Sequence, residues 1–330
     1  MEPNQEQSLG SLPDNMTLLP HFVRPGTAIT NLKCNFVLGN GGIGDLICYL
    51  QALKYVEKHW PHLKKKCFTF PFFMETAKLF LDDSWEWGVA DANGGVDLGP
   101  DPTPTAMPDT KCRINLAGLH PIDFGFLWYA NMMAPKGWNH YPKIDLSKVE
   151  NKAKHLQHYA VMTPGALVGV RQMLPQVFNG IVEHFKSIGV TPVFLGSSEI
   201  AKNYGAQFSE QYNYDGLDLR NKTSINEAMK VMEGARVVVG VDNGLLHLAG
   251  CTETPIVFNY SVASPEHRRP RRLAGYIYDI IPEVSCRFCQ SNFRFVTADI
   301  QGKCLYGDNA CLSDLSLEKN IRGIEAVRRR

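Results

Sequence analysis

The chain has 330 residues, of which 44% are hydrophobic and 20% are charged, and its net charge is +1. This balance excludes a disordered protein and gives no overall field that would attract nucleic acid or a membrane surface. No apolar run reaches the roughly 20 residues that a transmembrane helix needs, and the polar N-terminus lacks the features of a secretory signal. We therefore expect a cytoplasmic protein without a membrane span, long enough for two domains.

The N-terminal part begins with a polar arm, residues 1–30, and continues into a first domain, residues 31–150. Residues 34–38 have the composition of a short strand and are followed by a glycine-rich turn at 39–45. Apolar residues then recur at helical spacing until Pro61. A strand, a glycine turn and a helix in this order open a nucleotide-binding or phosphate-binding βα unit.

The middle of the chain shows weaker patterns. Residues 67–142 contain phenylalanine-rich pieces that we expect to be strand-like. Residues 120–138 are rich in aromatic side chains, and we expect them to form an irregular wall of a cleft. The polar stretch 147–158 is the expected linker between two domains.

Strands and helices alternate from residue 159 onward. The expected strands are residues 159–162, 190–195, 237–241 and 255–260, and an amphipathic helix is expected over 174–188. This alternation predicts a parallel sheet, here in a second domain over residues 151–280. The predicted fold class is therefore α/β, with two Rossmann-like domains facing each other across a cleft.

The most informative motif follows the expected strand 237–241. Asp242 or Asn243 is placed to cap the next helix, Gly244 permits a close backbone approach, and His247 lies one turn into the helix. Free amides at a helix start attract anions, most often phosphate, and open α/β sheets bind ligands at this edge. The alternative is an ordinary structural turn with a structural histidine.

Two pairs of cysteines form the second strong pattern: Cys286, Cys289, Cys304 and Cys311. Four thiolates suit a tetrahedral zinc or iron ion, whereas an oxidising compartment would favour two disulfides. We expect a metal-binding cysteine finger at residues 281–315. It would be structural, because four protein ligands leave no open coordination position. Residues 316–330 are expected to form a helix that packs back on the first domain.

A basic run precedes the finger, with four arginines in residues 267–272. Such a run can bind phosphate groups of a donor, a lipid or a nucleic acid. Its position after the last expected strand favours contact with an anionic ligand at the cleft, and the alternative is a solvated basic loop.

Three motifs in this order resemble glycosyltransferase family nine, the heptosyltransferase-like enzymes. They are residues 42–46, the block 163–199 and the block 223–249. The resemblance implies the GT-B fold and an inverting glycosyltransferase that uses a nucleotide-diphospho-sugar without a catalytic metal. The first domain would hold the acceptor and the second the donor. Part of the family, including the autotransporter heptosyltransferases, carries a similar cysteine finger that binds iron.

The resemblance also implies residue roles. Asp45 matches the general base that takes a proton from the acceptor hydroxyl, although it is also placed to cap its helix. Glu199 matches the acidic residue at the donor ribose, or is a surface residue. Thr223 and Ser224 match a backbone contact to the nucleobase, or are a plain helix cap. The donor-binding set is Gly44, Thr163, Arg171, Gln172, Gly196, Ser197, Glu199, Thr223, Ser224, Asp242, Asn243, Gly244 and His247.

The chain departs from the family at three positions. Asn243 stands where the family often has a threonine before the glycine of the Asp-x-Gly stretch. Gln172 stands where the family usually has a lysine that neutralises donor phosphate, and the neighbouring Arg171 can supply that charge. Gln51 stands where the family has a proline in the first helix. These changes leave the donor open among ADP-, GDP- and UDP-linked sugars, and the transferred group open among hexoses, heptoses and pentoses.

The acceptor hydroxyl is expected on a glycan, a protein or a modified DNA base, which would have to be flipped out of its duplex. Two other functions stay open at this point. One is a non-catalytic nucleotide-sugar fold that serves binding or assembly, and the other is a nucleotide-sugar epimerase. The sequence is also compatible with an oligomer.

Overall fold

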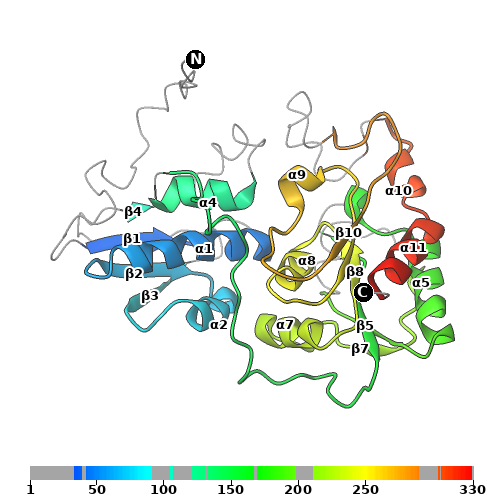
Figure 1. The fold of residues 1–330 in the computed structure, drawn as a ribbon, viewed down its shortest axis with the longest axis horizontal. Helices are drawn as coiled ribbons and strands as arrows, with labels where there is room; N and C mark the ends of the chain where they lie inside the picture. Colours follow the sequence, from blue (N-terminus) through cyan, green and yellow to red (C-terminus); the bar gives the residue numbers. More distant parts are fainter. Residues whose placement is uncertain are drawn as a thin grey trace.

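The structure is a computed structural model that describes residues 33–38, 42–90, 105–106, 120–130, 132–166, 169–197, 211–289, 304 and 306–328. Two separate parallel sheets, each flanked by helices, form two lobes (Figure 1). The predicted α/β class with two Rossmann-like domains is therefore confirmed. No helix among the described residues is both long enough and apolar enough to cross a bilayer.

The first sheet has the strand order β3-β2-β1-β4, and all its strand pairs are parallel. The strands are β1 (Lys33–Val37), β2 (Lys64–Thr69), β3 (Trp85–Val89) and β4 (Thr105–Ala106). The helices of this domain are α1 (Ile43–His59), α2 (Pro71–Phe80) and α4 (Pro121–Ala130). The predicted unit of strand, glycine turn and helix is thus present as β1 and α1.

The middle segment differs from its prediction. Residues 120–138 do not form an irregular wall throughout, because ten of them form the regular helix α4. Ile122, Phe126 and Tyr129 are fully buried where α4 packs along α1, and the Tyr129 hydroxyl donates to the Val37 carbonyl at 2.7 Å. The aromatic side chains therefore fill the core of the first domain.

The phenylalanine-rich stretch after β2 is also helical. Pro71 lies in the first turn of α2, where proline fits because its missing N–H has no partner in a helix anyway.

The second sheet has the strand order β10-β9-β8-β5-β6-β7, again with parallel pairs throughout. The strands are β5 (Tyr159–Thr163), β6 (Thr191–Phe194), β7 (Leu217–Asp218), β8 (Val238–Val241), β9 (Ile256–Asn259) and β10 (Ile277–Ile280). The chain builds outward from β5 on one side and then from β8 on the other. The strand order therefore reverses between β5 and β8, and ligands bind at such a point in doubly wound sheets.

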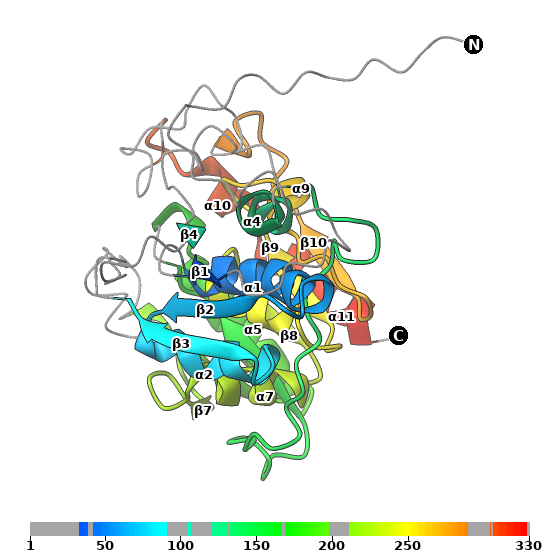
Figure 2. The same cartoon turned by 90° about the vertical axis from the view of Figure 1, so that its left-hand side faces the viewer.

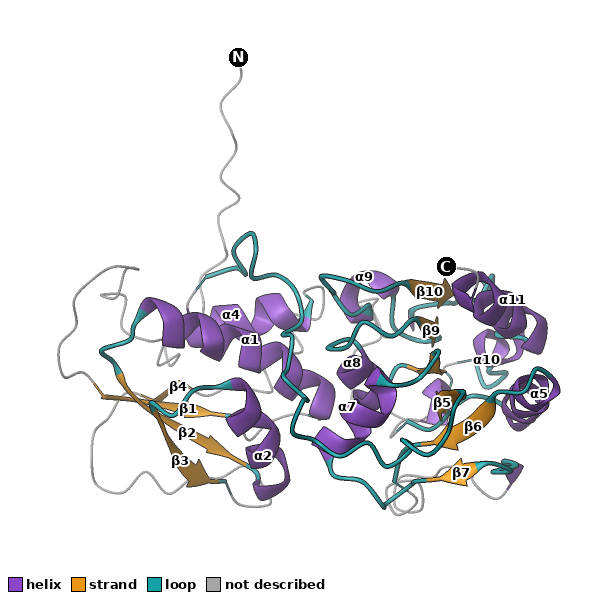
Figure 3. Ribbon diagram, turned by 60° about the horizontal axis from the view of Figure 1, so that its bottom comes forward, coloured by secondary structure: helices purple, strands orange, loops and turns teal. Residues whose placement is uncertain are grey.

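Helices cover both faces of this sheet. They are η1 (Gly169–Arg171), α5 (Pro175–Ser187), α7 (Ile225–Glu233), α8 (Gly244–Ala249), α9 (Pro265–Arg268), α10 (Ala310–Asp314) and α11 (Leu317–Arg328). Figure 3 shows α7 and α8 between the two sheets, and α5, α10 and α11 on the outer side of the second sheet.

The C-terminal helix does not pack back on the first domain, so that prediction was wrong. α11 packs against α5, β9 and β10. Its Asn320 is fully buried and exchanges two hydrogen bonds with Asn259 at the end of β9, at 2.9 and 3.1 Å. Gly323 lies so close to Tyr278 that a methyl group there would approach the ring to 2.8 Å. These polar and steric constraints hold the helix on the second sheet.

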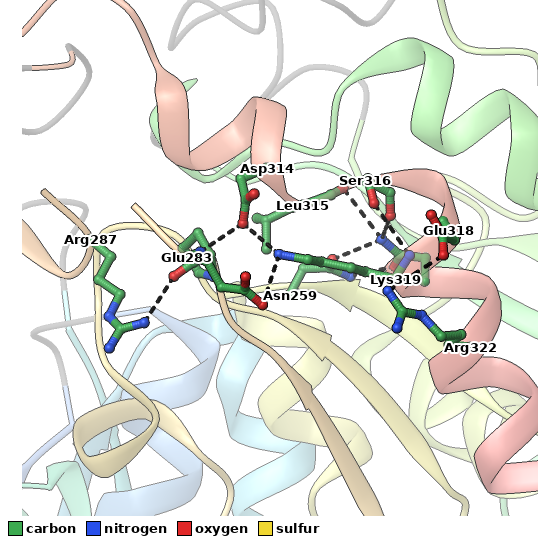
Figure 4. Close-up of polar contacts among 11 residues, drawn as sticks. Asn259, Glu283, Arg287, Asp314, Leu315, Ser316, Glu318, Lys319 and Arg322 are labelled. Atoms are coloured by element: carbon green, nitrogen blue, oxygen red, sulfur yellow. Dashed lines mark hydrogen bonds and ion pairs between the residues drawn. The ribbon is translucent and has the colours of Figure 1, made fainter. Parts of the chain in front are cut away.

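A polar network closes the start of α11. The Lys319 ammonium pairs with Asp314 at 2.6 Å, and the same Asp314 oxygen accepts from the Glu283 backbone N–H at 2.7 Å (Figure 4). The Asn320 amide donates to the Ser316 carbonyl at 3.0 Å. The last helix is thereby tied to the segment after β10.

The two domains meet through helices. α1 contacts α8, and α2 contacts α7. Seen from the side of the first domain, the strands β1 to β3 lie in front and the second domain lies behind them (Figure 2). The hydroxyl of Thr76 on α2 donates to the side-chain carbonyl of Asn226 on α7 at 2.9 Å, and both residues are buried. The domain boundary is therefore a packed interface.

We predict that Asn320→Ala lowers the free energy of unfolding by about 2–3 kcal/mol, because it removes both hydrogen bonds that Asn259 exchanges with Asn320 and leaves Asn259 only its bond to the Gly240 carbonyl. Arg322→Ala on the same helix is the control, since that side chain is 63% exposed and its ion pair with Glu318 spans 3.6 Å. Urea unfolding of both variants checks this. Equal midpoints for the two variants would show that the asparagine pair does not anchor α11.

Candidate functional site

The ends of β5 and β8 are joined by one side chain at the point where the strand order reverses. Asn243 caps α8, because its side-chain oxygen accepts from the Leu246 backbone N–H at 2.9 Å. Its amide nitrogen donates to the carbonyls of Thr163 at 3.0 Å and Gly165 at 2.7 Å. Asn243 is thus the helix cap, and Asp242 is left for another role.

Asp242 is the centre of a buried charged cluster. It is 4% exposed, and its carboxylate lies 3.2 Å from Arg171, 3.4 Å from His247 and 3.9 Å from Arg268. Burial alone would raise the pKa of this carboxyl, but the two guanidinium groups and the contact with His247 hold the pKa well below its usual range. Asp242 is therefore ionised at neutral pH.

The cluster carries a surplus of positive charge. Two guanidinium groups face one carboxylate, which leaves one net positive charge without the imidazole. The side chains of Arg171 and Arg268 are 15% and 24% exposed, so both retain some access from outside. A partly buried cationic site of this kind favours an anion, and guanidinium groups match phosphate oxygens in geometry.

His247 connects the Asp242 cluster to Tyr141, a residue from before the predicted linker. It is 4% exposed, and its Nδ1 lies 2.5 Å from the hydroxyl of Tyr141. Tyr141 precedes the predicted linker, and its backbone N–H donates to the Arg271 carbonyl at 2.5 Å. Tyr141, His247 and Asp242 therefore form a continuous row of polar side chains, and the Tyr141 backbone ties this row to Arg271.

Two glycines allow the domains to touch at this site. A methyl group at Gly44 in α1 would come within 2.7 Å of the His247 ring, and one at Gly244 in α8 would come within 2.9 Å of Ile43. Contacts below 3.0 Å are not tolerated without a shift. Both glycines of the predicted motifs thus lie at the contact between the domains.

Asp45 lies in the first turn of α1, next to Gly44. It is 9% exposed, and its carboxylate accepts from the backbone N–H of Gly42 at 2.9 Å. The capping interpretation of Asp45 is therefore confirmed. Its role as a general base stays a prediction, and its place beside Gly44 puts it at the domain boundary.

The departure at Gln172 has a structural explanation. Gln172 is 2% exposed and donates to the Ala166 carbonyl at 3.4 Å, so it points into the protein. The neighbouring Arg171 points to Asp242 instead. The positive charge is thus present one residue before the position where the family has its lysine.

The other donor-binding candidates lie along the same sheet edge or outside the described residues. Gly196 and Ser197 lie two and three residues after the end of β6, and the Gly196 carbonyl accepts from the Asn221 N–H at 3.0 Å. Ser224 caps α7 and exchanges hydrogen bonds of 2.8 and 3.2 Å with Glu227. Thr223 is partly buried just before that cap. Glu199 lies outside the described residues.

Most of the basic run serves the protein's own structure. Arg271 pairs with Asp123 of the first domain at 2.9 Å, and Arg269 pairs with Asp279 at 2.8 Å. Arg272 donates to backbone carbonyls of Thr252 and Thr254. Arg268 is the member of the run that reaches Asp242.

The four cysteines of the finger are all described, and none forms a disulfide. Burial, together with the three other cysteines nearby, raises the pKa of the Cys311 thiol to about 12. The described part of the chain nevertheless contains no group of three or more His, Cys, Asp or Glu residues placed to hold a metal ion. The thiols are gathered in one region without forming a closed ligand set.

Sequence reasoning missed Tyr141 entirely and did not single out Arg268 within its run. Tyr141 lies 106 positions before His247, in a segment without helical or strand periodicity. Arg268 could have been noted, because it is the first arginine after the turn that follows β9. No local pattern points to Tyr141.

Comparison with known proteins confirms the resemblance seen in the motifs. The family model described as glycosyltransferase family 9 (heptosyltransferase) matches residues 131–277. Lipooligosaccharide heptosyltransferase 2 of Haemophilus influenzae is 25% identical over 111 residues. That match covers 32% of this chain and 32% of the relative, so it spans about a third of the relative's length.

Solved structures confirm the GT-B fold. The iron-containing dodecameric glycosyltransferase TibC of enterotoxigenic E. coli superposes with a TM-score of 0.67 at 13% identity, over 91% of this chain and 76% of that one. The E. coli ADP-heptose lps heptosyltransferase II gives 0.61 at 12% identity, over 91% and 99%. TibC has also been solved in complex with ADP-D-β-D-heptose, at a TM-score of 0.64 and 13% identity, over 91% and 76%.

We predict that Gly44→Ala lowers the free energy of unfolding by about 1–3 kcal/mol, because the added methyl group meets the buried His247 ring. Gly165→Ala is the matched control. No heavy atom lies within 4 Å of its added methyl group, so it should change stability by less than about 0.5 kcal/mol. Chemical denaturation of both variants tests the contact between the domains. A stabilised Gly44→Ala, as expected for a free helix position, would contradict it.

Proposed function

We propose that this protein is an inverting glycosyltransferase that moves a sugar from a nucleotide-diphospho-sugar to an acceptor hydroxyl. One observation carries the proposal. Arg171, Arg268 and His247 converge on the buried Asp242 at the reversal point of the second sheet, opposite Gly44 of the first domain. The match to a glycosyltransferase family model over residues 131–277 supports it.

The charge of the cluster suits the leaving group. Breaking the bond between sugar and diphosphate leaves a nucleoside diphosphate whose negative charge grows in the transition state, and preorganised donors stabilise such charge most effectively. Arg171 and Arg268 provide guanidinium groups beside Asp242, which orients them. Both can make charge-assisted hydrogen bonds to phosphate oxygens. We propose that no catalytic metal takes part.

The nucleotide is proposed to be adenosine diphosphate, since the fold neighbour TibC is described in complex with ADP-D-β-D-heptose. GDP- and UDP-linked sugars are the alternatives. The transferred sugar is a heptose by the same comparison, with hexoses and pentoses as alternatives. The cytoplasmic location and the oligomeric state stay predictions.

Asp45 is proposed as the general base. It lies in the first turn of α1, beside the Gly44 contact with His247, so its carboxylate belongs to the domain that would hold the acceptor. A base on the first domain and a donor on the second place the attacking oxygen and the leaving group on opposite sides of the sugar. That geometry gives inversion at the anomeric carbon in one displacement. The acceptor hydroxyl would belong to a glycan, a protein or a modified DNA base.

The variant Asp45→Asn separates this function from its two rivals. A transferase should keep donor binding and lose transfer. A non-catalytic binding module should be unaffected, and a nucleotide-sugar epimerase would convert the donor in the absence of any acceptor.

We predict that an ADP-linked sugar raises the thermal transition of the wild type, since a ligand at 100 times its dissociation constant adds about 2.7 kcal/mol. Arg268→Ala should weaken this binding at least about tenfold, because it removes a charge-assisted hydrogen bond. Arg269→Ala is the control, as that neighbouring side chain pairs with Asp279. Equal effects of the two variants, or the absence of a shift with ADP-, GDP- and UDP-linked sugars, would contradict the proposed site.

The cysteine finger is proposed to hold a structural zinc or iron ion through Cys286, Cys289, Cys304 and Cys311. The donor set fits, since thiolates are the preferred ligands of both metals. A bound ion would keep the four thiols deprotonated and tie residues 281–315 together.

Metal analysis of the purified protein should find about one zinc or iron atom per chain. The ion should be lost in Cys286→Ser and retained in Cys34→Ser, whose cysteine is buried alone in β1. A metal-free wild type would refute the metal assignment.

A further inference from the structure

We propose that Tyr141 is a positioning residue for the nucleotide site: it fixes the ring orientation and the tautomer of His247, so that the Nε2–H is directed at Asp242. This inference rests on the proposed function, because it takes the cluster around Asp242 to be a nucleotide site. Its own geometry is independent of that function.

Tyr141, His247 and Asp242 are fixed in one buried row. The Tyr141 hydroxyl lies 2.5 Å from His247 Nδ1, and His247 Nε2 lies 3.4 Å from the Asp242 carboxylate. The three residues are 2%, 4% and 4% exposed, so water cannot replace either contact easily. The ring is also held by Phe258, which packs edge-on at a centroid distance of 6.4 Å.

Hydrogen-bond chemistry gives the row a direction. The ionised Asp242 has only acceptors, so the nitrogen that faces it must carry the proton. Burial raises the pKa of the Tyr141 hydroxyl well above its usual value, so Tyr141 keeps its proton and can donate to Nδ1. The Cys48 thiol also contacts the Tyr141 hydroxyl. Asp242 requires a proton on the nitrogen that faces it, and a Tyr141 hydroxyl that donates to Nδ1 requires that nitrogen to be unprotonated. Both contacts are satisfied together by the neutral tautomer with Nε2 protonated, in this orientation of the ring.

The orientation of His247 also affects how the two neighbouring arginines lie. With Nε2–H on one carboxylate oxygen, the other oxygen of Asp242 is left to Arg171 and Arg268. A rotated or differently protonated imidazole would withdraw that donor from Asp242. We therefore infer that Tyr141, although it does not reach the phosphates itself, sets how well the two arginines are oriented for them.

Tyr141 also belongs to the region where the domains are joined. Its backbone N–H bonds to the Arg271 carbonyl, and Arg271 pairs with Asp123 on α4. His247 itself faces Gly44 of α1. The orientation of His247 is thus coupled to the packing of the first domain against the second.

The tautomer can be read directly. Long-range ¹H–¹⁵N spectra of histidine-labelled full-length protein should show His247 with Nε2 protonated, its signal being assigned as the one that His247→Gln removes. Tyr141→Phe should shift this signal away from the Nε2–H form. Tyr129→Phe is the matched control, because Tyr129 is equally buried and donates to the Val37 carbonyl at 2.7 Å, away from the cluster. It should leave the signal unchanged.

A double-mutant cycle with ADP as the probe tests the action through His247. Tyr141→Phe should weaken ADP binding about tenfold in the wild type and hardly at all in His247→Gln, since the two residues act in one row. Additive losses, or a wild-type His247 with Nδ1 protonated, would overturn the inference. If none of ADP, GDP and UDP binds but the tautomer responds as expected, Tyr141 still orients His247 and the proposed function fails.

Discussion

The ionised carboxylate of Asp242, buried between two arginines and a histidine, is the interaction on which the rest of the site depends. A buried charge is strongly unfavourable unless it is paired. Arg171 comes from the loop after β5, Arg268 from the helix after β9, and His247 from α8. One carboxylate therefore fixes three segments relative to each other at the edge of the second sheet. The same arrangement keeps two cations close together at a partly open position.

The contact between the domains depends on small residues. Gly44 and Gly244 face His247 and Ile43, while Thr76 and Asn226 form a buried hydrogen bond nearby. The two domains are therefore in direct contact in this structure. The proposed base lies on one side of their boundary and the charged cluster on the other. A substrate-binding cycle would have to open this boundary and close it again, as in other enzymes whose sites form between domains.

Much of the fold could be predicted from the sequence, because βα units repeat with clear periodicity from residue 159 onward. The first domain was harder, since aromatic residues at 120–130 suit a strand, a wall or a helix equally well, and only packing against α1 decides for a helix. The motif at 242–247 gave the position of the site. Arg171 and His247, two partners of Asp242, were among the predicted site residues. Tyr141 could not be predicted, because it reaches His247 only through the tertiary fold. The placement of α11 depended likewise on the remote pair of Asn259 and Asn320.

The most direct test of the proposed site is a calorimetric titration of ADP, GDP and UDP, each compared with its nucleoside. If Arg171 and Arg268 recognise the diphosphate, one nucleoside diphosphate should bind more than about tenfold more tightly than its nucleoside, since hydrogen bonds to charged groups contribute about 1.5–3 kcal/mol each. Equal affinity for a diphosphate and its nucleoside would mean that the cluster around Asp242 does not bind phosphate. In that case the cluster would serve only to join the two domains.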